Sequence, residues 1–274
     1  MNQDVIELNG KKPGPTSVIL VGVHGNEKCG IRAIEELLPT LTIDAGKSFI
    51  IYGNPEAISK NVRFVDVNLN RLFGYPENTF PEEFVGYEYM RVGFLRQYLN
   101  QADYMLDIHA SLTPDSKPFL ICEKRSYEIA KYLQVPLVVT GFGKFQRGTD
   151  YYMDSLGKVG ICLECGYVSD KKSVVVAKDA IISFLKAVGH LNNDLEIIDQ
   201  EPLRLYDMYQ TKTDNFKLTK KFFDFELIKK GQLIGIDGAE EIQVNRDSYI
   251  LFARDRNKIN EEAFLLAEKE NGPA

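Results

Sequence analysis

The sequence predicts an α/β fold, a mixed sheet with helices on both faces, followed by a smaller C-terminal β-rich domain. Three observations lead to this prediction. The chain has 274 residues, 44% of them hydrophobic, which is enough for a sizeable core. Up to about residue 192, short apolar runs alternate with helical patterns, as in sheets covered by helices. After residue 193, short runs of alternating apolar and polar residues follow one another.

The elements of the α/β part follow from hydrophobic periodicity. The apolar run 17–23 predicts a strand, and from Glu27 onward apolar residues recur every three or four positions, which predicts a helix. By the same criteria we expect strands at 48–53, 102–110, 118–122, 136–141 and 158–165, and helices at 87–99, 126–133 and about 174–191. The segment 54–74 is too polar and irregular for a helix or a strand, and such segments are often functional.

The β-rich part is built from short runs punctuated by Gly, Asp and Asn. They lie at 203–212, 216–227, 231–238, 241–245 and 248–254. We therefore expect an α/β domain over residues 1–195 and a β-rich C-terminal domain over residues 196–274.

Charge and hydropathy limit the partners. The net charge of −6 and the pI of about 5.3 argue against a nucleic-acid surface. No apolar run approaches the ~20 residues that span a bilayer, and the N-terminal residues lack the apolar core of a signal peptide. The sequence therefore predicts a cytoplasmic protein with neither nucleic acid nor membrane as a partner, and it leaves homo-oligomerisation open.

Two of the four cysteines form a C-x-x-C motif, Cys162 and Cys165. A zinc ribbon would need a second such pair, which the chain lacks. The motif lies in a predicted strand, where residues three apart face opposite sides of the sheet. We therefore expect free thiols in a reducing compartment.

Polar residues gather where the predicted strands end. His24 and Glu27 follow the first strand, His109 ends the strand 102–110, and Glu164 interrupts an apolar strand. The polar segment 54–74 follows another strand. Each has a structural explanation when taken singly, but the carboxyl edge of a parallel sheet is where α/β proteins place their sites.

Together these residues suit a catalytic zinc site. Two histidines and one carboxylate hold zinc and leave a fourth position open for water. Glu164, in an apolar wall, suits a general base. A developing oxyanion needs a cation, which an arginine of the segment 54–74 supplies.

The motifs match a known family. "GVHGNE", "NPEAI" with the downstream "NLNRLF", "DIHAS" and "LECG" occur in this order. In order and spacing they resemble the motifs of the succinylglutamate desuccinylase/aspartoacylase family, a branch of the zinc carboxypeptidase-like enzymes. The resemblance covers roughly residues 17–190, and the β-rich C-terminal segment is also consistent with it.

The resemblance implies Zn²⁺ as the cofactor, held by His24, Glu27 and His109, with Glu164 as the general base. Glycines at 22 and 25 allow a sharp turn after the strand. Glu27 is then expected in the first turn of a helix, which Asn26 caps.

The resemblance also implies roles for the other polar residues. Arg63 polarises the scissile carbonyl, and Asn70 and Arg71 hold a substrate carboxylate. Asp107 lies two residues before His109, on the same strand face, and is expected to orient that imidazole from the second shell.

One departure from the family leaves the substrate open. In aspartoacylases an arginine about ten residues before the catalytic glutamate helps to bind aspartate, and Asp154 occupies that place here. Lys144 and Arg147 are near in sequence but do not align, and whether either contacts substrate stays open.

The expected function is that of a zinc-dependent amidohydrolase that deacylates an N-acyl amino acid or a similar small carboxylate. A zinc carboxypeptidase acting on peptides or peptidoglycan fragments is the first alternative. The second is a non-catalytic module that binds an anion at the "GVHGNE" loop. There, however, a histidine and a carboxylate would repel an anion unless a metal intervened.

Overall fold

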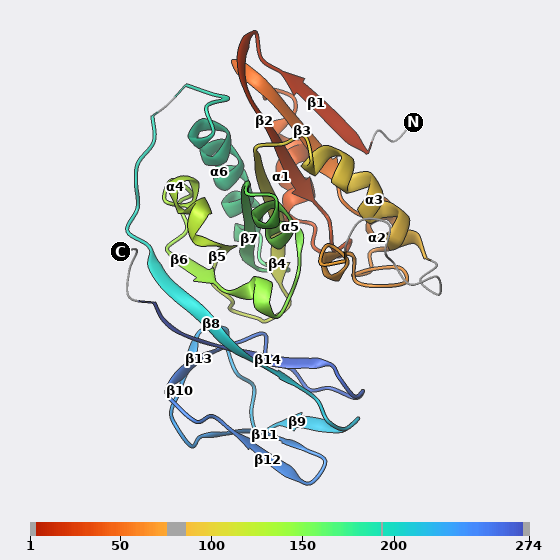
Figure 1. Ribbon diagram of the computed structural model, residues 1–274, viewed down its shortest axis with the longest axis vertical. Helices are drawn as coiled ribbons and strands as arrows, with labels where there is room; N and C mark the ends of the chain where they lie inside the picture. The colour runs from red at the N-terminus through yellow and green to blue at the C-terminus, as the bar shows by residue number, and fades with distance from the viewer. Residues whose placement is uncertain (1–3, 76–85, 193, 271–274) are drawn as a thin grey trace.

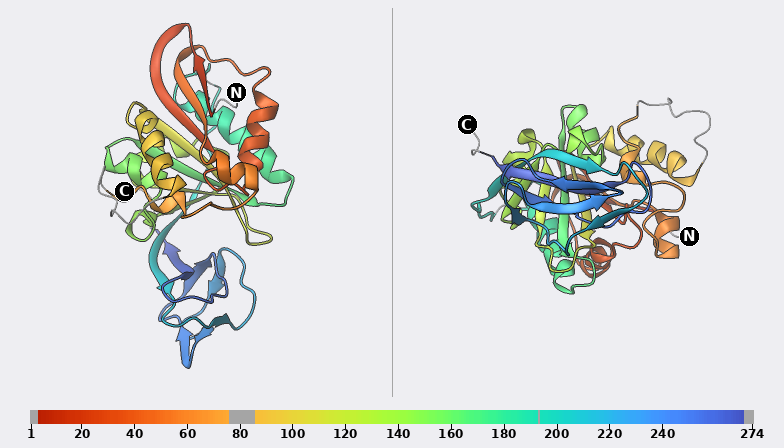
Figure 2. Two further views of the ribbon diagram at one scale, coloured as in Figure 1. Left: turned by 90° about the vertical axis from the view of Figure 1, so that its right-hand side faces the viewer. Right: turned by 90° about the horizontal axis from the view of Figure 1, so that it is seen from below.

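A computed structural model of the chain describes residues 4–75, 86–192 and 194–270. An 11-stranded mixed sheet runs through the molecule, with helices on both faces of its N-terminal part and a separate 3-stranded sheet near its far end. The C-terminal strands extend below the α/β body (Figures 1 and 2). This architecture confirms the predicted fold class.

The helix-covered part of the sheet has the order β1-β3-β2-β4-β7-β5-β6. Strands β3, β2, β4 and β7 are mutually parallel, β5 is antiparallel to β7, and β6 is parallel to β5. The strands are β1 (Val5–Asn9), β2 (Lys12–Val21), β3 (Ala45–Tyr52), β4 (Tyr104–Ser111), β5 (Phe119–Cys122), β6 (Leu137–Thr140) and β7 (Val159–Tyr167).

Alternate residues of each strand face different helices. On β2, Ile19 and Val21 pack in the cluster that includes residues of α1, α4 and α6, while Leu20 packs in the cluster of α3, η1 and α5. The helices are α1 (Cys29–Leu37), α2 (Pro55–Lys60), α3 (Tyr87–Leu99), α4 (Tyr127–Ala130), α5 (Thr149–Ser155) and α6 (Lys172–Ala187), and the 3-10 turns are η1 (Leu69–Arg71), η2 (Lys124–Ser126) and η3 (Phe142–Lys144).

A switch in chain direction opens a crevice between two neighbouring strands. The chain leaves β2 through α1 on one face of the sheet, and it reaches β4 from β3 through α2 and α3, of which α3 packs on the opposite face. The connections that follow the carboxyl ends of the neighbouring strands β2 and β3 therefore lead to opposite faces of the sheet. Ligand sites of open α/β sheets form at such points.

Several elements differ from the sequence prediction. The segment 54–74, expected to be irregular, contains α2 and η1. Asn54 caps α2 by accepting a 3.2 Å hydrogen bond from the Ala57 amide, and Pro55 opens the helix. An Asn-Pro pair before a helix is a recognised start signal. The strands β1 and β14 and the helix α5 were not predicted, and α4 is shorter than the helix expected at 126–133.

The C-terminal strands continue the main sheet. Strand β8 pairs in parallel with β6, and the order then runs β8-β14-β13-β10. Strands β12, β11 and β9 form the small sheet. The bounds are β8 (Glu201–Gln210), β9 (Phe216–Leu218), β10 (Glu226–Ile228), β11 (Leu233–Asp237), β12 (Glu240–Gln243), β13 (Ser248–Leu251) and β14 (Glu262–Lys269). The division of the chain at residue 195 stays a prediction.

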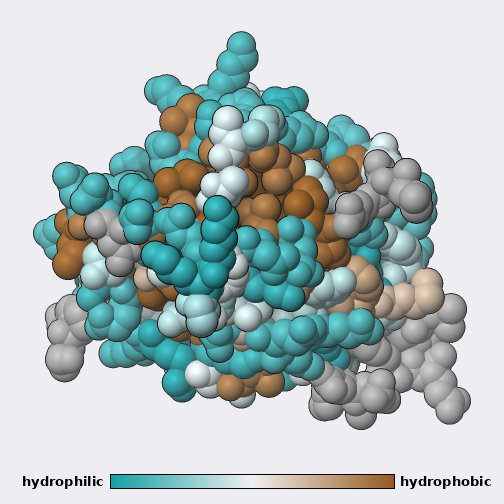
Figure 3. All heavy atoms as spheres, turned by 90° about the horizontal axis from the view of Figure 1, so that it is seen from above, coloured by the Kyte–Doolittle hydropathy of each residue, from teal (hydrophilic) through white to brown (hydrophobic). Residues whose placement is uncertain are grey.

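The surface opposite the C-terminal strands gathers apolar residues at its centre, with hydrophilic residues around them (Figure 3). Among the described residues, no helix combines the length and the apolar character needed to cross a bilayer.

A buried carboxylate ties the C-terminal segment to the end of β4. Asp224 Oδ2 accepts hydrogen bonds from the hydroxyls of Ser111 (2.9 Å) and Ser116 (2.7 Å), and its Oδ1 accepts from the Phe252 amide (2.7 Å). Ser111 lies two residues after His109 on β4. This contact therefore fixes the β13–β14 connection next to the predicted metal site.

We predict that Asp224→Asn lowers the free energy of unfolding by about 1–3 kcal/mol, because an amide cannot accept all three hydrogen bonds and places donors against donors. Urea titration measures the change. Asp214→Asn, at an exposed position of the same segment, is the matched control. A change as small as that of the control, within about 0.5 kcal/mol, would contradict the role of Asp224.

Candidate active site

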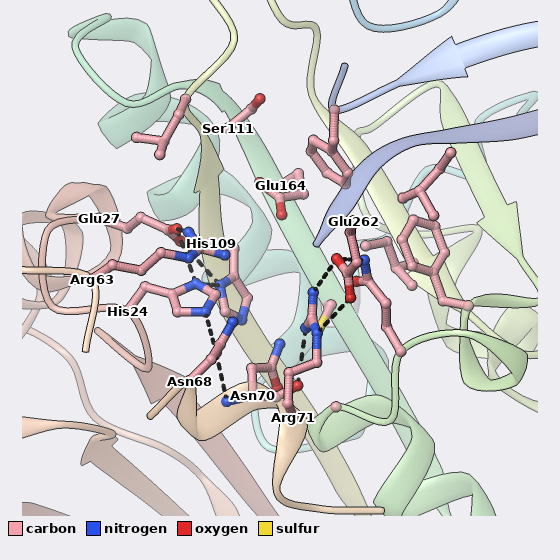
Figure 4. Close-up of a pocket in the computed structure, with 18 of the residues that line it drawn as sticks. His24, Glu27, Arg63, Asn68, Asn70, Arg71, His109, Ser111, Glu164 and Glu262 are labelled. Carbon is pink, nitrogen blue, oxygen red and sulfur yellow. Dashed lines mark hydrogen bonds and ion pairs between the residues drawn. The ribbon is translucent and has the colours of Figure 1, made fainter. Parts of the chain in front are cut away.

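A cavity of about 450 Å³ lies at the carboxyl ends of β2, β4 and β7 (Figure 4). Its walls come from the loop after β2, the segment 63–71, the ends of β4 and β7, and residues 252–265 of the C-terminal segment. The structure brings His24, Glu27, His109 and Glu164 into this cavity. A volume of this size suits a small molecule.

The loop between β2 and α1 makes a tight turn. Gly22 adopts a left-handed φ of 68°, and a side chain at Gly25 would meet the Ala57 backbone at 2.1 Å. The Glu27 amide donates a 3.1 Å hydrogen bond to the His24 carbonyl, which brings the two side chains to the same side.

Two expectations about this loop are wrong. Helix α1 begins at Cys29, so Glu27 lies in the loop and not in the first helical turn. Asn26 does not cap the helix, because its N-cap residue is Lys28, which makes no side-chain capping bond. The tight packing of the loop against α2 delays the start of the helix, and the periodicity of α1 alone does not reveal this.

His24, Glu27 and His109 converge on one point. Nδ1 of His24 lies 2.9 Å from one oxygen of Glu27, and Nδ1 of His109 lies 3.0 Å from the other. The two Nδ1 atoms are 3.2 Å apart. All three side chains are at most 4% exposed.

These separations suit a tetrahedral zinc ion. Zinc ligands about 2.0–2.1 Å from the metal lie about 3.3 Å from one another, close to the separations between these atoms. The donor set and its geometry thus fit the zinc that the resemblance implies.

Neighbouring side chains orient both imidazoles. Asn68 Oδ1 lies 3.0 Å from Nε2 of His24 and also accepts from the Asn70 amide, which identifies it as the oxygen. His24 therefore carries its proton on Nε2, and the lone pair of Nδ1 points to Glu27. Asp107 Oδ2 lies 2.9 Å from Nε2 of His109. This is the position expected for an orienting carboxylate.

The charges of the ligand group are tightly balanced. Burial lowers the pKa of His24 to about 4, so this imidazole is neutral at pH 7. Burial alone would also lower the pKa of His109, but Asp107 outweighs it and holds this pKa well above the usual value. Burial would raise the pKa of Glu27, but His24 and His109 outweigh it and keep this pKa well below the usual value.

Arg63 reaches the same carboxylate. Its Nη1 donates a 2.7 Å hydrogen bond to Glu27 Oε1, and the side chain remains 32% exposed. The arginine thus stands at the border between the ligand group and the cavity (Figure 4), where its remaining donors can reach a bound molecule.

Glu164 lies beside His109 in the register of β4 and β7. Its Oε2 is enclosed and has no hydrogen-bond partner among the described residues. Burial, and next the charge of Glu27, raise the pKa of Glu164 to about 8. A carboxyl group with a pKa near neutrality, facing a cavity, can both accept and deliver a proton.

The segment 63–71 is held by a residue that the sequence did not single out. Glu88 on α3 is fully buried and accepts hydrogen bonds from the Asn54 side chain and from the amides of residues 65, 66 and 67. A glutamate in the first turn of a helix ordinarily reads as a favourable end charge. The residues around Glu88 in the sequence therefore do not indicate that it organises a distant loop.

Arg71 and Asn70 line the cavity but already have partners. Arg71 forms a two-point ion pair with Glu262 of β14, through Nε (3.1 Å) and Nη2 (3.0 Å), and Gln146 also donates to Glu262 (2.7 Å). Asn70 Oδ1 accepts from the Thr149 amide at 3.1 Å.

The remaining sequence candidates lie outside the cavity wall. Lys144 and Arg147 are not among the lining residues. Nδ1 of His190, the third histidine, donates a 2.8 Å hydrogen bond to the Ala45 carbonyl, and its Nε2 lies 2.7 Å from the Ser17 hydroxyl, which indicates a structural role. In contrast, the C-terminal segment contributes cavity residues that sequence patterns did not reveal, among them Arg254, Arg256, Glu261 and Glu262.

The four cysteines are free and buried. Cys162 and Cys165 belong to different apolar clusters, so the C-x-x-C thiols face opposite sides of the sheet as expected. Cys162 also forms a second group of potential metal ligands with Asp107 and His109. Burial and nearby carboxylates raise the pKa of Cys162 above its usual value, which disfavours the thiolate that a metal needs.

The comparisons with known proteins agree with this site. The succinylglutamate desuccinylase/aspartoacylase catalytic domain model matches residues 13–192. The chain belongs to this family. The match confirms the resemblance carried by the four motifs.

Two curated relatives in the family are deacylating enzymes by name. The succinylglutamate desuccinylase of Shewanella baltica (strain OS185) is 26% identical over 270 residues, covering 85% of this chain and 76% of that protein. The N-acyl-aromatic-L-amino acid amidohydrolase (carboxylate-forming) of Xenopus tropicalis is 24% identical over 201 residues, covering 66% of this chain. The chain spans 62% of the length of that second relative.

A solved structure supports the fold. The succinylglutamate desuccinylase of Vibrio cholerae superposes with a TM-score of 0.81 at 18% identity, over 97% of this chain and 85% of that one. The similarity covers the C-terminal strands as well as the α/β body, because the match extends over nearly the whole chain.

We predict that the purified protein binds about one zinc per chain and that the double variant His24→Ala, His109→Ala loses it. Metal analysis by mass spectrometry measures the content. Cys162→Ala and His190→Gln are the controls and should keep the zinc. Full zinc content in the double variant would contradict the site, and loss in Cys162→Ala would favour the second ligand group.

Proposed function

We propose that this protein is a zinc-dependent amidohydrolase that removes the acyl group from an N-acylated amino acid or a similar small carboxylate. The observation that carries the proposal is the placement of an enclosed carboxyl group, Glu164, beside a three-residue metal-ligand group at one end of a small cavity. Family membership and the names of the relatives support the same reaction class.

Zinc, when bound, would supply the Lewis acid that activates water and polarises the amide carbonyl. Glu164 takes a proton from the attacking water and delivers it to the nitrogen as the C–N bond breaks, so that a carboxylate and an amine leave. Arg63 donates to the oxyanion of the tetrahedral intermediate. Its contact with Glu27 holds its guanidinium at the edge of the metal-ligand group, which supports this role.

A hydrolysis screen tests the reaction class. Zinc-loaded protein is incubated with N-acetyl, N-succinyl and N-formyl amino acids, and with short peptides that have a free C-terminus. Release of the free amino acid from the acylated compounds supports the proposal. Hydrolysis of the peptides alone would instead support the carboxypeptidase alternative, and zinc-loaded protein with no hydrolysis of either group would contradict a hydrolase.

We predict that Glu164→Gln lowers turnover by ~100-fold or more, because the amide keeps the size of the side chain but cannot accept the proton. Steady-state kinetics and zinc analysis on the same sample check this, and the variant should keep its zinc. Undiminished turnover in Glu164→Gln would contradict the role of Glu164 as the base.

We also predict how Glu164→Gln changes the melting temperature of the metal-free protein. The pKa of Glu164 is about 8 in the folded state, above its usual value of 4.5, so the wild type loses stability as pH rises from about 4.5 to 8. Glu164→Gln removes this loss and should melt at the same or a higher temperature at pH 8. A large drop in melting temperature would indicate a structural ion pair at Glu164.

Arg63→Ala should chiefly lower turnover, by ~100-fold or more, the scale for losing an oxyanion donor. The exposed Arg246→Ala, which removes an arginine far from the cavity, is the control. If Arg63→Ala raised only KM and left turnover unchanged, Arg63 would act in binding and not on the oxyanion.

A further inference from the structure

We propose that Arg254 is the receptor for a carboxylate of the substrate, so that the C-terminal segment supplies the cation that recognises it. This inference rests on the proposed deacylase function and names the residue that recognises its substrate. The cations that line the cavity differ in whether their donors are available to a ligand.

Among the described residues, Arg254 is the cavity arginine whose guanidinium donors are all open. It lies three residues after β13 and lines the cavity as a partly buried side chain. Within residues 4–75, 86–192 and 194–270, its guanidinium makes no hydrogen bond and no ion pair. A guanidinium offers five donors and a permanent charge, and enclosing it without a partner is costly. A ligand that carries a carboxylate would supply the partner.

The other cavity arginines are already engaged. Arg63 contacts Glu27, and Arg256 donates through Nε to the Glu262 carbonyl at 2.6 Å. The planar fork of Arg71 is filled by both oxygens of the Glu262 carboxylate. A substrate carboxylate at Arg71 would have to displace Glu262, whereas at Arg254 it displaces nothing from the described chain.

The cations near Arg254 favour an incoming anion. Burial and the charges of Arg63 and Arg256 lower the pKa of Arg254, and Asp224 and Glu164 act in the opposite direction without forming an ion pair with it. The guanidinium still remains charged near neutral pH. Arg63 and Arg256 thus lie near enough to repel Arg254, and a bound carboxylate would relieve this repulsion.

The position of Arg254 is fixed by the contact between the C-terminal segment and β4. The Phe252 amide, two residues before Arg254, donates to Asp224, which in turn holds Ser111. Phe252 adopts a left-handed φ of 54° and packs against Phe119 of β5, with ring centroids 5.9 Å apart. A non-glycine residue in this conformation persists only where its surroundings determine it. The backbone that carries Arg254 is therefore held at a defined place in the cavity wall.

Two parts of the substrate could carry the carboxylate. One is the distal carboxylate of a dicarboxylic acyl group such as succinyl, and the other is the α-carboxylate of the amino acid. Either one can accept two parallel hydrogen bonds from a guanidinium. The shared chemistry is a carboxylate near the scissile amide, and the test below separates the two sources.

Four compounds form the test: N-succinyl-L-alanine, N-acetyl-L-alanine, N-succinyl-L-alaninamide and N-acetyl-L-alaninamide. The first carries both carboxylates, the second only the α-carboxylate, the third only the acyl carboxylate, and the fourth neither. Calorimetry measures their binding to zinc-loaded protein in a Glu164→Gln background, with Arg254 or with Arg254→Met. We expect Arg254→Met to weaken the compounds that carry the recognised carboxylate by about 10- to 100-fold, and to leave N-acetyl-L-alaninamide unchanged.

The pattern of the losses identifies the source. A loss confined to the two succinyl compounds assigns the acyl carboxylate, and a loss confined to the two free acids assigns the α-carboxylate. An equal loss for all four compounds, or wild-type binding that shows no preference for either carboxylate, would overturn the proposal.

Two further variants and one further readout separate recognition from structure. Arg254→Lys keeps the charge and should recover part of the lost affinity, while the exposed Arg246→Met should have no effect. Arg254→Met should melt at the same or a higher temperature, because it relieves repulsion with Arg63 and Arg256. A lower melting temperature without a loss of carboxylate binding would overturn the role. Failure of the deacylase proposal would instead appear as a wild type that binds carboxylates through Arg254 but hydrolyses none of the acylated compounds.

Discussion

The carboxylate of Glu27 is the contact on which the candidate site depends. Its two oxygens meet the imidazoles of His24 and His109, the guanidinium of Arg63 and the amide of residue 110. It thereby joins the loop after β2, the segment 63–71 and the end of β4. A buried carboxylate is stable only when its lone pairs are matched by donors or by a cation, so each partner is held in place by the need to satisfy the same group.

The fold explains why these partners meet. The connections after the neighbouring strands β2 and β3 lead to helices on opposite faces of the sheet, and ligand sites form where connections separate in this way. The pleat of β4 and β7 places His109 next to Glu164. The C-terminal strands then close the cavity from the other side through the contact of Asp224 with Ser111. In the proposed reaction, the α/β body supplies the catalytic groups, and the C-terminal segment shapes the space that would hold the substrate.

The elements and residues predicted correctly from the sequence are those whose chemistry and local hydrophobic pattern point to the same structure. The strands around His24, His109 and Glu164 were predicted from their apolar runs, and the polar residues in them pointed to the site. The helix 87–99 was predicted at the same bounds as α3. The resemblance to the family, carried by four short motifs, is confirmed by the matched domain.

What the sequence could not show depends on contacts between distant segments. Glu88 organises the segment 63–71 from a separate helix, and nothing in its neighbours distinguishes it from a surface glutamate. Glu262 and Arg254 lie in a β-rich region whose strands suggest only a sheet, yet they reach the cavity because β8 adds to β6 and turns this region toward the site. The late start of α1 likewise follows from packing of the loop against α2.

The proposed reaction requires one metal ion bound by His24, Glu27 and His109. Diffraction from crystals of the zinc-loaded protein, recorded on both sides of the zinc absorption edge, tests it directly. The account predicts one anomalous peak, with Nδ1 of both histidines and a Glu27 oxygen about 2.0–2.2 Å from it. A peak bound instead by Asp107, His109 and Cys162, or no peak at this end of the cavity, would contradict it.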